Sequence, residues 1–165
     1  MITVALSATI GAPHERVWNA LVDPAQRGAW DERVLGEVPV PRARSHSRAR
    51  ERGGADTATP LRETRWRFRL GTVPLVMHDR IMAADRGDRL VSRISIGSMH
   101  FDQTLTLHVD DDETGPRTRL GMKLVGSNSI AVIGEVVPRL DVQKMLIEYV
   151  DTTLRQIQKY CEASA

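Results

Sequence analysis

The stretch Pro138–Cys161, PRLDVQKMLIEYVDTTLRQIQKYC, decides the fold. It predicts one long amphipathic helix that begins at Pro138, because a proline at the first helical position leaves no N–H unpaired. Apolar residues recur at spacings of three and four, which draw one stripe along a helix: Ile147, Val150, Leu154, Ile157 and Cys161. A single helix gains little stability in water without packing, so the upstream chain must supply the surface that covers this stripe.

The totals describe an ordinary globular protein. With 165 residues and a formal net charge of +2, the chain is long enough for one hydrophobic core and too weakly charged to imply a polyanionic partner. Its one cysteine, Cys161, excludes an internal disulfide and is typical of a reducing compartment. No apolar run approaches the roughly 20 residues of a membrane span, and the N-terminus has no signal-peptide pattern, so we expect a cytoplasmic protein.

Upstream of the long helix the sequence reads as strands, two short helices and turns. Thr3–Ile10 predicts a strand, Pro13 begins a short helix that Asp23-Pro24 stops, and Ala25–Trp30 can form a second short helix or a turn. Six further strands follow from alternating or β-branched runs: Val34–Val40, Thr64–Leu70, Leu75–Ala84, Leu90–Ile96, Phe101–Val109 and Thr118–Leu124. The prediction is an α+β fold in which a seven-stranded antiparallel sheet wraps around the C-terminal helix.

The segment Arg42–Pro60 interrupts this pattern. It is rich in arginine and almost without apolar residues, so we expect an exposed basic loop within a single domain of residues 1–165. It offers no aromatic side chain on which a base could stack, and a run of charge is usually a solvated face. Both points argue against nucleic acid as a partner.

The opening of the chain resembles a known superfamily. The motif Ala12–Pro24, APHERVWNALVDP, followed by Trp30, resembles the start of the START/SRPBCC helix-grip superfamily, in which a proline-initiated helix carries Val-Trp and ends at Asp-Pro. The stretch Pro116–Leu120 and the C-terminal helix extend the resemblance, which is greatest to the bacterial polyketide cyclase/dehydrase-like proteins. The resemblance implies a cavity between sheet and helix for a hydrophobic small molecule. Arg42–Pro60 departs from it, being longer and more basic than the corresponding loop.

Neither a metal site nor a cofactor motif is found in the sequence. The five histidines stand far apart, with no pair at helical i, i+4 spacing, and Asp110–Glu113 lacks the alternating ligands of a calcium loop. There is no nucleophile elbow, no dinucleotide fingerprint and no phosphate loop. We therefore expect no metal and no cofactor.

Polar residues that share the apolar face of a strand or helix are the candidates for chemistry. Asp79 has the parity of Met77 and Ile81, so it is expected to face inward, where a desolvated carboxyl could act as an acid or base. An irregularity near Ile81 would instead leave Asp79 at the rim. Gln103 lies on the apolar face of its strand and Tyr149 on the flank of the helix stripe, where it could also be a packed ring.

The predicted ligand-binding set combines these polar groups with apolar walls. Trp66, Phe68, Met77, Phe101 and Met122 alternate with polar residues along their strands and would wall the cavity, although plain core filling explains the same pattern. Gln103 and Tyr149 complete the ligand-binding set. If the protein is an enzyme, Asp79 and Tyr149 are its expected catalytic residues.

Three functions remain open at this point, because one fold supports many activities. The first is a carrier that binds a lipid- or polyketide-like small molecule, as a monomer or homodimer. The second is a cofactor-independent cyclase, aromatase or dehydratase that acts on a polyketide-like substrate in the same cavity. The third is a protein that uses the fold to bind another macromolecule. An apolar cavity would favour the carrier, and a converging set of Asp, Tyr, His or Arg would favour the enzyme.

Overall fold

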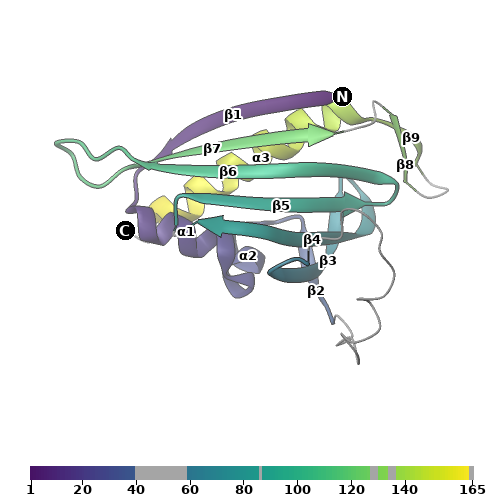
Figure 1. Ribbon diagram of the computed structural model, residues 1–165, viewed down its shortest axis with the longest axis horizontal. Helices are drawn as coiled ribbons and strands as arrows, with labels where there is room; N and C mark the ends of the chain where they lie inside the picture. The colour runs from purple at the N-terminus through teal and green to yellow at the C-terminus, as the bar shows by residue number, and fades with distance from the viewer. Residues whose placement is uncertain (40–58, 86, 127–129, 134–136, 164–165) are drawn as a thin grey trace.

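A seven-stranded antiparallel sheet curves around one long helix at the C-terminus (Figure 1). The structure, a computed structural model, describes residues 1–39, 59–85, 87–126, 130–133 and 137–163. The elements in chain order are β1 (Ile2–Ile10), α1 (His14–Val22), α2 (Pro24–Trp30), β2 (Val34–Val38), β3 (Arg62–Leu70), β4 (Val73–Asp85), β5 (Arg89–Ile96), β6 (Met99–Val109), β7 (Thr118–Gly126), β8 (Ile130–Ile133), β9 (Val137–Asp141) and α3 (Val142–Ala163). The predicted fold class is confirmed.

The order of strands in the sheet is β1-β7-β6-β5-β4-β3-β2, so every neighbour from β2 to β7 is also a neighbour in sequence. The first strand departs from this order, because β1 pairs with β7 at the far edge. Residues directly opposite one another in an antiparallel pair share a face. Thr64, Asp79, Ile94 and Phe101 lie in one such row across β3 to β6, and this row faces α3.

Helix α3 lies across the concave face of the sheet and buries one side against it (Figure 1). Its buried residues are Val142, Met145, Leu146, Tyr149, Val150, Thr153, Leu154, Ile157 and Cys161. Four of the five residues of the predicted stripe are among them. The prediction was wrong for Ile147, which is 44% exposed, because it lies about 100° around the helix from Leu146 and misses the sheet.

The long helix begins later than its sequence predicts. Residues Val137–Asp141, including Pro138, form β9, which pairs with β8 in a small two-stranded sheet. The side chain of Asp141 accepts a hydrogen bond from the backbone N–H of Lys144 at 3.2 Å. A carboxylate in this position caps the first turn, which explains why the helix begins at Val142 rather than at Pro138.

The corner between α1 and α2 depends on Asp23. This residue ends α1, and its carboxylate accepts a hydrogen bond from the N–H of Ala25 at 3.0 Å, which caps α2. Trp30 at the end of α2 donates its indole N–H to the carbonyl oxygen of Ala20 at 2.8 Å. These hydrogen bonds hold the two short helices together, and the prediction of two short helices after the first strand is confirmed.

Two further expectations concern the basic loop and a membrane span. Residues 40–58 lie outside the described residues, so the basic loop expected at 42–60 stays a prediction. Among the helices of the described ranges, none is both long enough and apolar enough to span a membrane. The longest, α3, has Lys144, Asp151 and Arg155 among its charged residues.

We predict that Leu154→Asp lowers the free energy of unfolding by more than about 3 kcal/mol, because Leu154 is only 6% exposed and a charge there has no partner. Ile147→Asp is the matched control on the exposed side of the same helix and should cost about 1 kcal/mol or less. Urea denaturation of both variants measures the difference. Equal losses would contradict the packing of α3 described here.

Candidate functional site

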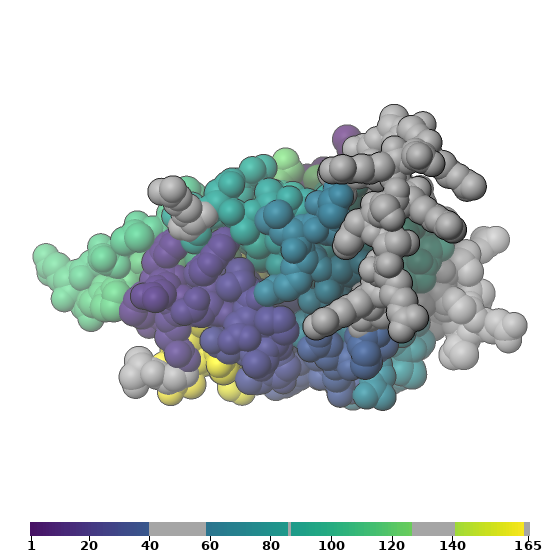
Figure 2. Space-filling view, turned by 60° about the horizontal axis from the view of Figure 1, so that its bottom comes forward, coloured from purple at the N-terminus to yellow at the C-terminus, as the bar shows by residue number. Residues whose placement is uncertain are grey.

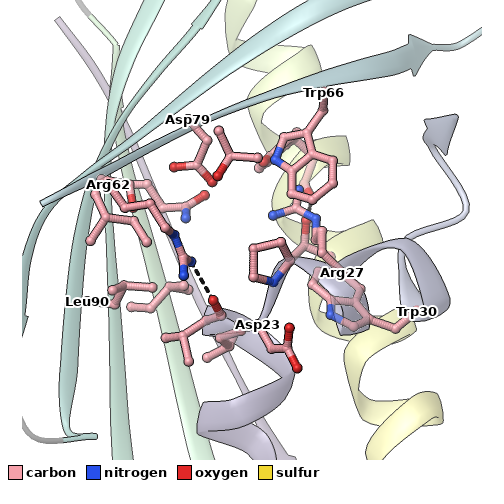
Figure 3. A pocket seen from close by; sticks show the side chains of 17 residues that line it. Asp23, Arg27, Trp30, Arg62, Trp66, Asp79 and Leu90 are labelled. Carbon is pink, nitrogen blue, oxygen red and sulfur yellow. Dashed lines mark hydrogen bonds between the residues drawn. The ribbon is translucent and has the colours of Figure 1, made fainter. Parts of the chain in front are cut away.

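A small pocket lies between the α1–α2 corner, the inner face of β3 to β6 and the middle of α3 (Figure 3). In the space-filling view, the purple surface that includes α1 and α2 abuts the blue and teal surface of the strands (Figure 2). The free space inside is about 20 Å³, which holds roughly one water molecule. The sequence predicts a cavity between the sheet and this helix, and a cavity large enough for a ligand stays a prediction.

Four buried side-chain atoms that line this pocket have no hydrogen-bond partner among the described residues. They are Arg27 Nη2, Trp66 Nε1, Asp79 Oδ1 and Gln103 Oε1. They come from four different elements, α2, β3, β4 and β6. A buried polar group without a partner costs about 1–3 kcal/mol, and most such groups in native proteins are paired. Their convergence indicates a place where a water molecule or a polar ligand completes the hydrogen bonding.

Arg27 is held in place by a buried ionic network. Its Nε donates to Asp31 Oδ2 at 2.8 Å, and Arg33 Nε donates to Asp31 Oδ1 at 2.8 Å. Arg33 also donates from Nη2 to Thr153 Oγ1 at 2.8 Å, so the network reaches α3. The guanidinium carbon of Arg27 lies 4.9 Å from the ring centre of Trp30. Since one edge of the guanidinium is engaged, its Nη2 keeps a fixed direction.

The two acidic groups near Arg27 have pKa values shifted in opposite directions. Burial raises the pKa of Asp79, against the opposing influence of Arg27, Arg62 and Ser92. Burial alone would also raise the pKa of Asp31, but the adjacent guanidinium groups of Arg27 and Arg33 outweigh it and lower the pKa. Asp31 is therefore a fixed anion, whereas Asp79 can exchange a proton in a milder range of pH.

Asp79 faces inward, as its parity predicts. It lies opposite Thr64 on β3 and Ile94 on β5, both on the inner face of the sheet. The irregularity in β4 falls between Ile81 and Ala83, beyond the carboxyl group, so it does not turn Asp79 outward. The residue is half-buried, with Oδ1 screened from solvent.

Tyr149 lines the pocket with a closely packed ring, and its hydroxyl lies close enough to Arg27 to interact with the guanidinium group. The ring meets Phe101 edge to face at 5.5 Å and Phe68 at 6.2 Å. Its O–H donates to the sulfur of Met77 at 3.9 Å, a weak hydrogen bond. This arrangement matches the packed ring that the sequence analysis gave as the alternative for Tyr149. A catalytic role for Tyr149 stays a prediction.

The family can now be named from the whole chain. A family model described as polyketide cyclase/dehydrase and lipid transport matches residues 1–162. The chain belongs to this family. No curated protein sequence matches it.

Solved structures of distant relatives share the fold. A START superfamily protein from Mycobacterium smegmatis is 12% identical with a TM-score of 0.69, each chain being 99% covered. The Zhui aromatase/cyclase from Streptomyces sp. R1128 is 15% identical with a TM-score of 0.68, over 98% of this chain and 93% of that one. A protein from Thermus thermophilus is 19% identical with a TM-score of 0.63 and 99% coverage of both. The predicted START/SRPBCC resemblance is confirmed, and these identities establish fold alone.

The predicted ligand-binding residues of this family member separate into two groups. Trp66, Gln103 and Tyr149 line the pocket, as does Asp79. The other four predicted wall residues lie in the core beside it and do not line it: Phe68, Met77, Phe101 and Met122. Alternation along a strand identifies the inner face but not the depth at which a side chain meets the helix. For these four, core filling describes their position, and a ligand contact stays a prediction.

Several pocket residues were not predicted from the sequence. Arg27 lies one turn before Asp31, on the same face of α2 as Trp30, and this i, i+4 pairing next to an aromatic was a signal for a buried arginine. Arg62 continues the inward parity of β3 two residues beyond Thr64, at the start of the strand. Ser92 lies in the middle of β5, between the buried residues Leu90 and Ile94. The alternation along each strand was the signal for both.

No group of three or more His, Cys, Asp or Glu side chains in the described part of the chain is arranged to hold a metal ion. Arg62, at the mouth of the pocket, donates a hydrogen bond to the carbonyl oxygen of Val22 (Figure 3). The arrangement can therefore bind a ligand through hydrogen bonds and charge, and Asp79 is the group placed to transfer a proton.

We predict opposite pH trends for Asp31→Asn and Asp79→Asn. Asp31 has a lowered folded pKa, so its stabilisation is present above about pH 4 and is lost as the pH falls through the folded pKa. Asp31→Asn should cost about 3–5 kcal/mol at pH 7, because it leaves two buried cations unpaired, and less at acidic pH.

Asp79→Asn serves as the matched control in the same pocket. The raised pKa makes the wild-type protein lose stability as the pH rises from about 4 through that folded pKa, and the neutral amide has no such loss. The stability of Asp79→Asn relative to wild type should therefore increase with pH. Urea denaturation at several pH values measures both trends, and parallel trends would contradict the assigned shifts.

Proposed function

We propose that this protein binds a hydrophobic small molecule that carries oxygen atoms, such as a polyketide- or lipid-like compound, in the pocket between the sheet and α3. The observation that carries the proposal is the convergence of four buried, unpartnered polar atoms of the described residues on one pocket. Ligand sites of this kind have apolar walls and a few polar groups that fix orientation. Leu90, Leu105 and Ile81 supply apolar lining here.

Binding requires the pocket to expand. Its free space of about 20 Å³ is far below the roughly 300–1,000 Å³ of pockets for drug-sized ligands. Arg62 is placed to move, because its exposed side chain bridges the mouth through a hydrogen bond to Val22 rather than through core packing. Family membership supports the proposal, since the family description includes lipid transport.

A neutral apolar dye, N-phenyl-1-naphthylamine, tests binding by its fluorescence increase. Ser92→Val adds bulk inside the pocket, and we expect it to weaken dye binding at least about tenfold, since no free space remains for the dye. Ser95→Val is the matched control, because Ser95 lies on the outer face of the same strand. Its dye affinity should equal that of the wild type. Wild-type protein that binds no dye, or equal affinities in both variants, would refute the proposed site.

Catalysis is the second candidate function, and Asp79 is the observation that favours it. A desolvated carboxyl group with a raised pKa, facing a bound oxygenated chain, is suited to move protons in a cyclisation or dehydration. One of the structures that shares the fold is an aromatase/cyclase. The pocket contains no other described carboxyl group of this kind, since Asp23 caps α2 at the mouth.

The two functions differ in what Asp79→Asn does. A linear poly-β-keto thioester, which cyclises slowly by itself, serves as the substrate, with products measured by liquid chromatography and mass spectrometry. If the protein is a cyclase, wild type changes the rate or product pattern, and Asp79→Asn reduces that effect about 10²–10⁴-fold while dye binding survives. If it is a carrier, the wild-type protein leaves the reaction unchanged and Asp79→Asn alters affinity by about 0.5–1.5 kcal/mol.

A further inference from the structure

Among the described residues, the ionic network that holds Arg27 beside the pocket has one positive charge in excess. Asp31 is shared by Arg27 and Arg33, so two guanidinium groups face one carboxylate, a net charge of +1. These three side chains are at most 13% exposed. Burial raises the pKa of Asp79, against the opposing influence of Arg27, and in its neutral form Asp79 adds no negative charge to this network. At the mouth, Arg62 and Asp23 contribute one charge of each sign. A buried, uncompensated cation is costly, and an anion in the pocket would remove that cost.

Two N–H donors are already directed at the place such an anion would occupy. Arg27 Nη2 and Trp66 Nε1 are both buried and without a partner in the described part of the chain, and Figure 3 shows both side chains on the same side of the pocket. Arg27 cannot turn away without breaking its hydrogen bond to Asp31. A guanidinium N–H next to a second fixed N–H suits the oxygen atoms of a carboxylate.

The other side of the pocket complements a second oxygen atom. Asp79 lies across the space from Trp66 in Figure 3, and its neutral form carries an O–H donor. The amide of Gln103, whose Oε1 has no partner among the described residues, holds both a donor and an acceptor. Neutral Asp79 can donate to that oxygen atom, and Gln103 Oε1 can accept from a hydroxyl group of the ligand or from a water molecule, so this side complements an oxygen-bearing group beside the anion.

We propose that the ligand of this pocket is a carboxylic acid, bound as its carboxylate to Arg27 and Trp66. Its apolar body lies against the aliphatic lining that includes Ile81, Leu90 and Leu105. This assignment of a ligand class rests on the proposed function, which requires only that the pocket binds a small molecule. It adds the chemistry of the head group and the two side chains that select it.

Benzoate and benzamide are the probes, because they have the same shape and differ in charge. Titrations of ¹⁵N-labelled protein follow the indole N–H signal of Trp66, assigned by its loss in Trp66→Phe. Benzoate should move this signal and bind at least about tenfold more tightly than benzamide, as expected for charge-assisted hydrogen bonds in a buried site. The indole signal of Trp30, which donates to Ala20, should move little.

Variants then assign the preference to its two donors. Trp66→Phe should reduce the ratio of benzoate to benzamide affinity several-fold, and Arg27→Gln combined with Asp31→Asn should abolish it. The double variant removes the Arg27 cation together with the Asp31 anion, and Arg33, which loses its carboxylate, keeps its hydrogen bond to Thr153. Arg67→Gln is the matched control, since it removes the same charge from the exposed, outer face of β3. Its affinity ratio should equal that of the wild type.

The results separate this inference from the function on which it rests. Equal affinities for benzoate and benzamide in the wild-type protein, with the neutral dye still bound, would overturn the carboxylate assignment and leave the binding function intact. Loss of dye binding as well would refute both. If the double variant proves unfolded, Trp66→Phe decides alone, and an unchanged affinity ratio in that variant would place the anion elsewhere and overturn the proposal.

Discussion

The site depends on one buried carboxylate. Asp31 accepts hydrogen bonds from Arg27 on α2 and from Arg33 just after it, while Arg33 continues to Thr153 on α3. The carboxylate thus fixes the α2–β2 junction against the long helix and fixes the direction of Arg27. A buried ion pair gives little net stability, because desolvating its members costs about as much as their attraction returns. What it provides here is geometry: the guanidinium that reaches the pocket cannot rotate freely.

The pocket combines groups that most cores exclude. Four side chains each leave one buried polar atom without a partner in the described structure: Arg27, Trp66, Asp79 and Gln103. Buried polar groups are normally paired, so four unpaired atoms in one pocket are unusual. Such departures are tolerated where the rest of the domain supplies enough stability, and they cluster at functional sites. The aromatic cluster of Phe68, Phe101 and Tyr149 next to the pocket is fully packed and supplies that support.

The sequence predicted the fold better than the site, for physical reasons. Strand alternation placed Asp79, Gln103 and Trp66 on the inner face, because a period of two leaves only two choices. It could not give depth: Phe68 and Met122, expected in the cavity wall, are buried in the core beside the pocket, and their contact with a ligand stays a prediction. Arg27 was missed because an arginine on a seven-residue helix usually points to solvent, and only the network with Asp31 and Arg33 keeps it inside. Pro138 was compatible with the start of a helix. It lies in β9 instead, because β9 pairs with β8, and the local sequence pattern does not reveal that partner strand.

The crossover of β1 has a consequence for the order in which the chain can fold. Strand β1 is synthesised long before its partner β7, and the hydroxyl of Thr118 donates to the carbonyl oxygen of Ala12 across a separation of 106 residues. The carboxylate of Glu162 on α3 then receives the N–H of Gly11 at 2.9 Å. Contacts of such long range are slow to form, because loop closure costs entropy before any contact repays it. The edge of β1 must therefore stay without its partner through most of synthesis, and the C-terminal residues complete a structure that the N-terminal residues began.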